Sequence, residues 1–237
     1  MAAVVRPRFY PAIGIALGLV VLAGFARTLY LRYWFDVPPI DVITLLHGVV
    51  FTGWMILFIV QTRLIAANNV RAHMRLGVAG AALAALVFVL GMLTVIASAS
   101  APRPRPMGMT SPHFVFVPLF IIVTFASLVT AAVLLRRRAQ YHKRLMTLAM
   151  IVVLPPAVAR LIMLSGATGH FLLLQTSVTA AFVMCCVAYD WVKYRLLHPV
   201  YVIGGTLLIL SWPFRVWVAR SEAWGHVGRW MAGLSGG

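Results

Sequence analysis

This chain of 237 residues contains seven histidines, and six of them lie at or near the start of six different apolar stretches. The six are His47, His73, His113, His142, His170 and His198. Neutral imidazole is a good ligand for iron, copper and zinc, and polar side chains within membrane helices usually face the protein interior and mark function. The histidines are therefore the first candidates for chemistry, as ligands of a metal or of a planar metal cofactor clamped between helices.

The stretches that carry them are long enough to cross a membrane. Apolar residues make up 62% of the chain and charged residues 10%, whereas a soluble domain has about 25% charged residues. A membrane-spanning helix needs about 20 apolar residues. Seven stretches approach or reach that length, at 11–26 (extended by aromatic residues in 28–34), 42–60, 76–99, 114–135, 145–164, 171–189 and 200–218. We predict an all-α, polytopic membrane helix bundle that forms a single domain over residues 1–237, with spans two to five as a central four-helix bundle.

The net charge of +16 reflects basic residues in the loops and not a nucleic-acid surface. If the N-terminus is cytoplasmic, twelve basic residues fall inside, and seven fall outside or near that boundary. The inside set is Arg6, Arg8, Arg63, Arg71, Arg75, Arg136, Arg137, Arg138, Lys143, Arg144, Lys193 and Arg195, and the outside set is Arg27, Arg32, Arg103, Arg105, Arg215, Arg220 and Arg229. By the positive-inside rule we predict a bacterial inner-membrane protein with a cytoplasmic N-terminus and a periplasmic C-terminus.

Two features of the stretches have simple explanations. Arg6 and Arg8 before an apolar run resemble a signal peptide, but the aromatic boundary residues that follow favour an uncleaved first helix.

Cys185 and Cys186 are adjacent in the sixth stretch, so they point about 100° apart on a helix. They are expected to be packing residues, with soft-metal ligation as the minor alternative.

Two segments resemble each other, at about 42–99 and 112–164. Each has a histidine at the outer start of one span and a His-x-Arg-Leu sequence at the inner start of the next. The first copy has His47 and His73, separated by 26 residues, and the second has His113 and His142, separated by 29. Such parallel repeats place sites at the interface between the copies.

In a bundle built from these spans, His47 and His113 lie at the outer side and His73 and His142 at the inner side. Each pair can face across the core, as metal and cofactor ligands of helix bundles do. His170 competes with His113 as the outer partner. His198 and His226 lie outside the repeat and are expected to be interfacial.

Among metal groups, haem fits the residue types best. Carboxylates such as those of most non-haem iron sites are missing from the middle of every span, whereas haem needs only two axial side chains. Its propionates prefer nearby cations, and several lie close to the histidines. Arg71, Arg75, Lys143 and Arg144 are next to the inner pair, and Arg160, near the outer end of the fifth span, is an alternative partner for an outer propionate or an anionic substrate.

These motifs resemble the four-histidine b-type transmembrane cytochromes, and more closely uncharacterised bacterial membrane-protein families with a His…His-Arg-x-Leu-Gly pattern. The resemblance covers about residues 40–165, through Leu46-His47-Gly48, Gln61, His73-x-Arg75-Leu76-Gly77 and His142-Lys143-Arg144-Leu145-Met146. It implies pairing of His47 with His113 and of His73 with His142. The separation within the first pair of spans is shorter here than in those cytochromes, and His73 and His142 lie close to the loops.

We therefore expect a membrane cytochrome-like protein that binds one or two haem b groups and transfers electrons, with a quinone or a redox protein as partner. The alternatives are a non-redox membrane factor, for metal handling or for assembly of cytochrome oxidase or haem, and a small-solute transporter. Some relatives of the pattern are tied to such assembly, whereas no span has an acidic site or broken-helix motif of the kind transporters use. The sequence leaves open whether the protein is an enzyme.

Overall fold

The structure, a computed structural model, describes residues 8–101 and 105–234, and its regular elements in those residues are all helices. Seven helical segments in this part of the chain are long and apolar enough to cross a membrane. They are Phe9–Tyr30, Val42–Ala66, Val70–Ala99, Ser111–Leu134, Ala139–Ser165, Thr168–Tyr194 and Val200–Ala219. The predicted all-α polytopic bundle is confirmed, and the protein is a multi-pass membrane protein. Arg6 and Arg103 lie outside the described residues.

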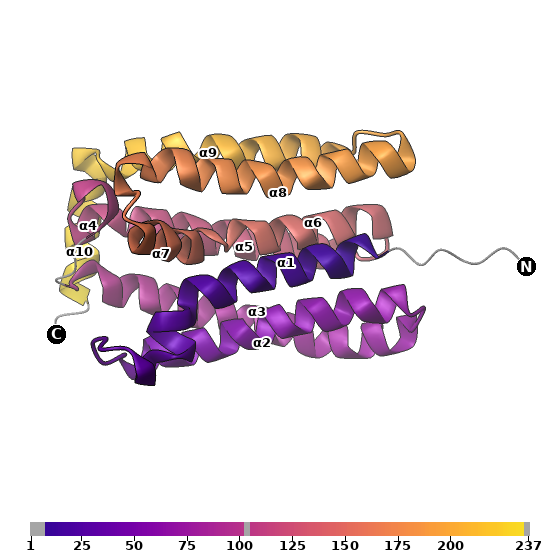
Figure 1. The fold of residues 1–237 in the computed structure, drawn as a ribbon, viewed down its shortest axis with the longest axis horizontal. Coiled ribbons are helices and arrows are strands. Elements are labelled where there is room, and N and C mark those ends of the chain that lie inside the picture. The colour runs from indigo at the N-terminus through magenta and orange to yellow at the C-terminus, as the bar shows by residue number, and fades with distance from the viewer. Residues whose placement is uncertain (1–7, 102–104, 235–237) are drawn as a thin grey trace, which may run out of the picture.

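The spans lie side by side along one axis, with short connections at both ends (Figure 1). The α-helices are α1 (Phe9–Phe25), α2 (Val42–Ala66), α3 (Val70–Ala99), α4 (Ser111–Phe114), α5 (Phe116–Leu134), α6 (Ala139–Val152), α7 (Pro155–Ser165), α8 (Phe171–Tyr194), α9 (Gly205–Ala219) and α10 (Glu222–Leu234). We call the end at which α1, α3 and α6 begin the His73 end. The opposite end, which α10 crosses, is the α10 end.

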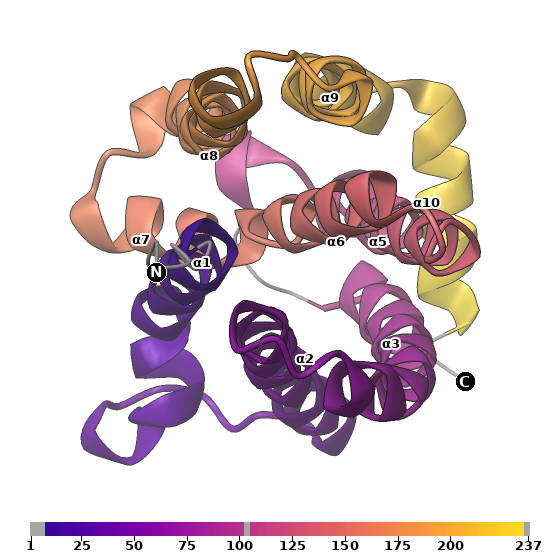
Figure 2. The same cartoon turned by 90° about the vertical axis from the view of Figure 1, so that its right-hand side faces the viewer.

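The fifth span, α6 followed by α7, lies at the centre of the bundle. Two thirds of it is buried, against one third or less of every other span in the described chain. Viewed from the His73 end, α6 lies between α8 and α9 on one side and α2 and α3 on the other (Figure 2). Trp54 of α2 joins them, because its Nε1 donates to Met150 Sδ at 3.1 Å and its ring meets Phe125 edge-on. Spans two to five therefore share one core, as predicted.

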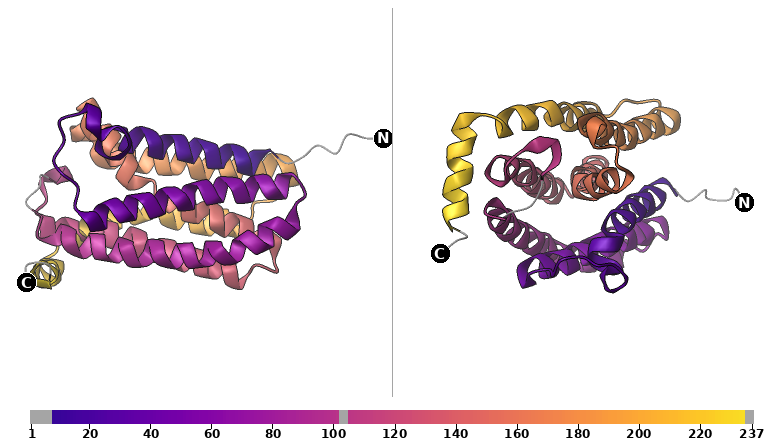
Figure 3. Two further views of the ribbon diagram at one scale, coloured as in Figure 1. Left: turned by 90° about the horizontal axis from the view of Figure 1, so that it is seen from below. Right: turned by 60° about the vertical axis from the view of Figure 1, so that its left-hand side comes forward.

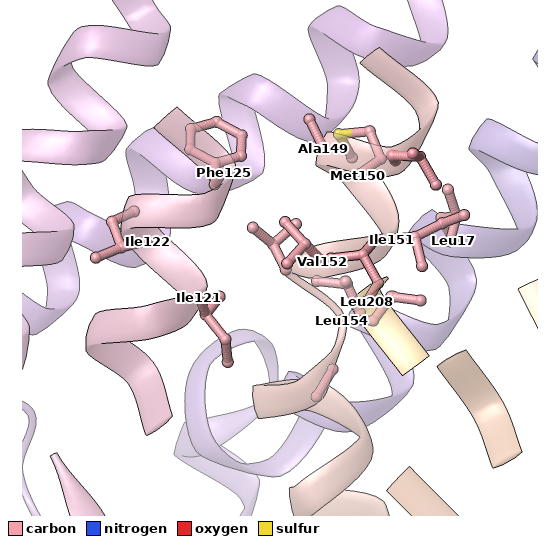
Figure 4. Packing of buried hydrophobic residues seen from close by; sticks show 14 of the residues in the cluster. Leu17, Ile121, Ile122, Phe125, Ala149, Met150, Ile151, Val152, Leu154 and Leu208 are labelled. Carbon is pink, nitrogen blue, oxygen red and sulfur yellow. The ribbon is translucent and has the colours of Figure 1, made fainter. Parts of the chain in front are cut away.

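Aliphatic side chains fill the space between α5 and α6. Ile121 of α5 lies on the side towards Val152 of α6, whereas Ile122 points away from α6 (Figure 4) and packs near Gly91 of α3. The surrounding lipid is as apolar as the protein interior, so the hydrophobic effect contributes little to the contact between α5 and α6. Close van der Waals packing holds these helices together instead. Two prolines then break the span, because Pro155 cannot donate a backbone hydrogen bond. The span is interrupted here, since α6 ends at Val152 and α7 begins at Pro155.

Glycines allow α1 to approach two neighbours closely. Gly14 and Gly18 face α2, where an added Cβ would lie 3.2 Å and 3.4 Å from side-chain atoms. Gly24 faces the backbone of α7, where an added Cβ would lie 2.5 Å from the carbonyl oxygen of Ala157. The first span thus packs as a full member of the bundle, with Leu17 completely buried.

The last helix, α10, does not follow the bundle axis. It lies across the end of the bundle beside α3 and α4, as the two further views show (Figure 3). Gly225, Gly228 and Met231 face the bundle, whereas Val227 and Trp230 are exposed. One apolar face therefore packs on protein and another is free to meet lipid, which is typical of a helix at a membrane interface.

The contact at Gly24 gives a stability prediction. Gly24→Ala should lower the free energy of unfolding in detergent by about 1–3 kcal/mol, because the backbone of α7 cannot yield to a new methyl group. The matched control is Gly53→Ala in α2, where an added Cβ meets only Leu83 at 3.9 Å. That variant should be neutral or slightly more stable, since alanine favours helix. Equal effects of the two substitutions would contradict this packing.

Candidate functional site

Two histidines of the repeat meet at the His73 end. His73 lies one turn into α3 and His142 one turn into α6. Their ring centroids are 6.2 Å apart, and the ring planes are nearly perpendicular, at 82°. The structure thus brings together the pair that the sequence predicts for the inner side.

The ring of His142 is held by a carbonyl at the end of α5. Its Nδ1 lies 2.8 Å from the carbonyl oxygen of Ala132, which falls in the last turn of α5 and has no helical partner. A carbonyl can only accept, so Nδ1 carries the proton and Nε2 of the neutral ring keeps its lone pair. Ligating histidines are commonly oriented by such a bond through the other ring nitrogen.

The ring of His73 also brings a nitrogen without a partner. Its Nδ1 is buried and makes no hydrogen bond within the described residues. The ring lies beside the backbone carbonyl of Gln61 on α2, and the side-chain Oε1 of Gln61 is likewise buried without a partner. Buried polar atoms in membrane proteins are rarely left unmatched, so this part of the bundle has unused capacity to bind.

The separation of the two rings suits one shared metal ion. Two imidazole nitrogens that each bind a metal at about 2 Å place their ring centroids roughly 6 Å apart. In residues 8–101 and 105–234, no group of three or more His, Cys, Asp or Glu side chains is gathered for a metal. A cofactor that brings its own equatorial nitrogens needs only two axial side chains, so haem fits this ligand set.

The predicted outer pair does not meet. His47 lies on α2 beside Phe51 and near Gly91 of α3. His113 bonds through Nδ1 to Thr110 Oγ1 at 2.8 Å, and its ring packs beneath Gly225 of α10. Among the described side chains, the two rings make no contact with each other. Gly225 of α10 lies against the His113 ring, and the pairing of His47 with His113 stays a prediction.

The remaining histidines separate clearly. His170 is exposed in a single 3-10 turn, and His226 is exposed on α10 next to Arg229. His198, expected at the interface, is instead buried in the connection before α9, where its ring meets Tyr141 edge-on. Burial lowers the pKa of His198, and the positive charge of Arg144 lowers it further.

Apart from Arg144, the expected propionate cations fall into three environments. Arg71 and Arg75 are exposed and line a shallow hollow on α3, next to but not including His73. Lys143 donates to the hydroxyl of Tyr194 at 3.3 Å. Arg160 donates to the Pro156 carbonyl and stacks on Phe25 at 4.1 Å, which ties α7 to α1.

The structure gives Arg144 a different role from the expected one. Its Nε and Nη2 donate to the two carboxylate oxygens of Asp190 on α8, at 2.6 and 2.8 Å, and its Nη1 donates to Gln140. Both side chains of the ion pair are fully buried. With every edge of its guanidinium engaged, Arg144 does not serve as a propionate partner.

Aromatic hydroxyls surround this ion pair. Tyr10 of α1 and Tyr201, in the π-helical turn Val200–Gly204, lie next to Arg144 and close to each other. Both hydroxyls are buried, and neither makes a hydrogen bond of normal geometry within the described chain. The sequence signal for the ion pair is Asp190 itself, the one acidic residue inside a long span. A count of basic residues in the loops does not consider it.

The glycines near His73 pack against α2. An added Cβ at Gly77 would lie 3.7 Å from Gln61 Nε2, and one at Gly80 would lie 3.1 Å from Leu57. Their small size therefore serves the contact between α2 and α3. Cys186 is buried, as expected of a packing residue, whereas Cys185 is exposed, and both thiols are free.

Comparison with known protein families, curated proteins and solved structures gave no match to this chain.

The ion pair gives a second stability prediction. Asp190→Asn should destabilise the protein by about 3–5 kcal/mol, because it leaves the Arg144 cation uncompensated inside the bundle. The double variant Arg144→Met/Asp190→Leu should recover most of that loss, and Glu222→Gln, at an exposed carboxylate of α10, should change little. Unfolding in detergent measures all three. A neutral result for Asp190→Asn would contradict the assigned pair.

Proposed function

We propose that this protein is a membrane cytochrome that binds one haem b at the His73 end, where His73 and His142 would hold the group. The observation that carries the proposal is the 6.2 Å approach of these two rings, one of which is oriented by a carbonyl through its Nδ1. Bound haem would supply reversible one-electron transfer.

The chain's own residues would hold and surround the group. The bond from His142 to Ala132 fixes the neutral tautomer and aims Nε2 away from α5. The buried Nδ1 of His73 supplies a second nitrogen that nothing else in the described chain uses. Arg71 and Arg75 are exposed on the same turn of α3 but about 200° round the helix from His73, so they would meet a propionate only at the outer surface of α3.

A site one turn from the end of the bundle suits exchange with partners at the membrane surface. We infer that electrons pass to or from a quinone in the bilayer or a redox protein docked at the His73 end. The protein belongs in a bacterial inner membrane on this proposal, with the His73 end in the cytoplasm and the C-terminus in the periplasm. Support for this orientation comes from Arg136, Arg137 and Arg138, which lie at that end.

One observation favours a second function, the handling of a bare transition-metal ion by the same pair. Leu57 and Gln61 pack against Gly80 and Gly77 beside His73, and an ion needs less room there than a macrocycle. The Gln61 side-chain oxygen, buried without a partner, would then be a third ligand. The experiment on haem therefore includes metal analysis.

Substitution of either histidine should abolish haem binding. The protein purified after expression with ample haem should show a b-type band on dithionite reduction, and His73→Ala or His142→Ala should each remove it, since each deletes one of two axial ligands. Imidazole added to His73→Gly should restore part of the band. His47→Ala and His113→Ala are the matched controls and should retain it.

Two results would overturn the haem proposal. One is a wild-type protein without the band, and the other is a band that survives both His73→Ala and His142→Ala. Copurifying zinc, copper or iron that is lost in those two variants, without any haem spectrum, would support the bare metal ion instead.

The orientation can be tested independently of the cofactor. Reporter fusions after Arg138, at the His73 end, should report cytoplasm, and fusions after Gly108, at the α10 end, should report periplasm. The basic loops at the His73 end provide the physical reason, because positively charged loops stay on the cytoplasmic side. Reversed reporter signals would place the histidine pair at the periplasmic face.

A further inference from the structure

A second buried cation lies far from the histidine pair, towards the α10 end. Arg215, one turn before the end of α9, is 1% exposed and is among the largest fully buried side chains. Its guanidinium lies 4.4 Å from the ring centre of Trp212 on its own helix and 4.9 Å from that of Phe120 on α5. Its Nε and Nη2 both donate to the hydroxyl of Ser211. Its Nη1 is buried and has no partner within the described residues.

No carboxylate of the described chain balances this charge. The whole chain has four acidic side chains, and within residues 8–101 and 105–234 the only ion pair is that of Arg144 with Asp190. The other three, Asp36, Asp41 and Glu222, are exposed. Aromatic faces attract a cation, but they do not neutralise it. Arginines buried in a membrane bundle usually pair with a counter-charge or mark a binding site.

The direction of the side chain excludes simple snorkelling. A snorkelling arginine extends its charged group to the nearest membrane surface, which for Arg215 is the α10 end. Its guanidinium instead bonds to Ser211, one helical turn closer to the middle of the bundle. The aliphatic stem therefore carries the charge away from the surface and into the protein.

A second unused donor lies in the same aromatic region. Trp224 of α10 has a buried Nε1 without an acceptor. Its ring meets Phe116 of α5 at 4.8 Å, and Phe116 is 6.1 Å from Phe120, which stacks on Arg215. Two buried N–H donors, one of them charged, thus lie among the aromatic side chains of α5, α9 and α10.

We propose that this region is a binding site for an oxyanion, a carboxylate or a phosphate group, with Arg215 Nη1 as its main donor and Trp224 Nε1 as the second. A carboxylate or phosphate is the group that a guanidinium binds best. Either an amphiphile or a small soluble anion can carry that group. The aromatic walls would exclude water from the contact and strengthen it. This site is separate from the histidine pair and does not depend on haem.

Thermal unfolding of the full chain in dodecyl maltoside, an uncharged detergent, tests the site with three probes: oleate, dioctanoyl phosphatidylglycerol and inorganic phosphate. At least one should raise the unfolding midpoint of the wild-type protein in a saturable way, since a ligand that binds only the folded state stabilises it. Oleate alone would identify a fatty carboxylate, the short lipid a lipid headgroup, and phosphate a soluble anion. The fluorescence of Trp212, next to the guanidinium, should change over the same concentration range.

Variants then assign the effect to Arg215. Arg215→Met should weaken binding by roughly tenfold to a hundredfold, as loss of a charge-assisted hydrogen bond does. Without any probe it should raise the unfolding midpoint, because it removes an unbalanced buried charge. Arg220→Met, at an exposed arginine five residues further on, should bind as the wild type does. Trp224→Phe, which keeps the ring and removes the donor, should weaken binding by a smaller factor.

Three results would overturn the site. One is a wild-type protein that none of the probes stabilises, whatever the behaviour of the variants. Another is equal binding by Arg215→Met and the wild type. The third is an equal loss in Arg220→Met, which would show attraction to the general surface charge. If Arg215→Met does not fold, the wild-type titration and Trp224→Phe still decide.

Discussion

A polar group inside a bilayer has no water to bond with, so protein must supply its partner, and this constraint governs where the helices of this bundle meet. Trp54 of α2 reaches the sulfur of Met150 at the centre, and Gln175 of α8 donates to the Pro155 carbonyl where the fifth span is broken. Each such contact fixes the rotation of one helix against another. Apolar packing alone, between side chains and lipid of similar character, fixes rotation far less firmly.

The same constraint gives weight to the buried polar atoms that remain without partners. Those at His73 and Gln61 lie together at one end of the bundle, and those at Arg215 and Trp224 lie in one aromatic region towards the other. Other such atoms lie elsewhere in the described chain, at Thr28, His47 and Gln175. At the two places named, the free atoms suit a ligand, with neutral side-chain atoms at His73 and Gln61 and one charged and one neutral N–H donor at Arg215 and Trp224.

The sequence predicts the parts of this structure that depend on local pattern. Hydropathy gives the seven spans, and the Pro155-Pro156 pair marks the break in the fifth. Asp41, a residue type that favours the N-cap position, caps α2, where its carboxylate accepts from the backbone N–H of Thr44. The two His-x-Arg-Leu sequences also identify the histidines that meet, because equal positions in two repeated spans lie at equal depth.

Local sequence patterns do not reveal contacts between segments that are far apart in the chain. The pairing of His113 with His47 rests on the repeat and on the resemblance, and neither reveals that Gly225 of α10 lies against the His113 ring. Counting arginines by loop treats each one as an orientation signal, so it cannot distinguish Arg215, which faces into the bundle, from Arg220, which is exposed. Arg144 is separated from Asp190 by 46 residues, and only the fold brings them together.

The ion pair and the histidine pair are connected through the geometry of α6. His142 and Arg144 are two residues apart, so their side chains leave the helix about 200° apart. Bidentate bonding of Arg144 to Asp190 turns one side of α6 towards α8. The opposite side, which carries His142, is thereby turned towards α5 and α3, where the Ala132 carbonyl and the His73 ring lie. A buried ion pair in this position does more than hold two helices together, because it sets the direction in which the candidate ligand points.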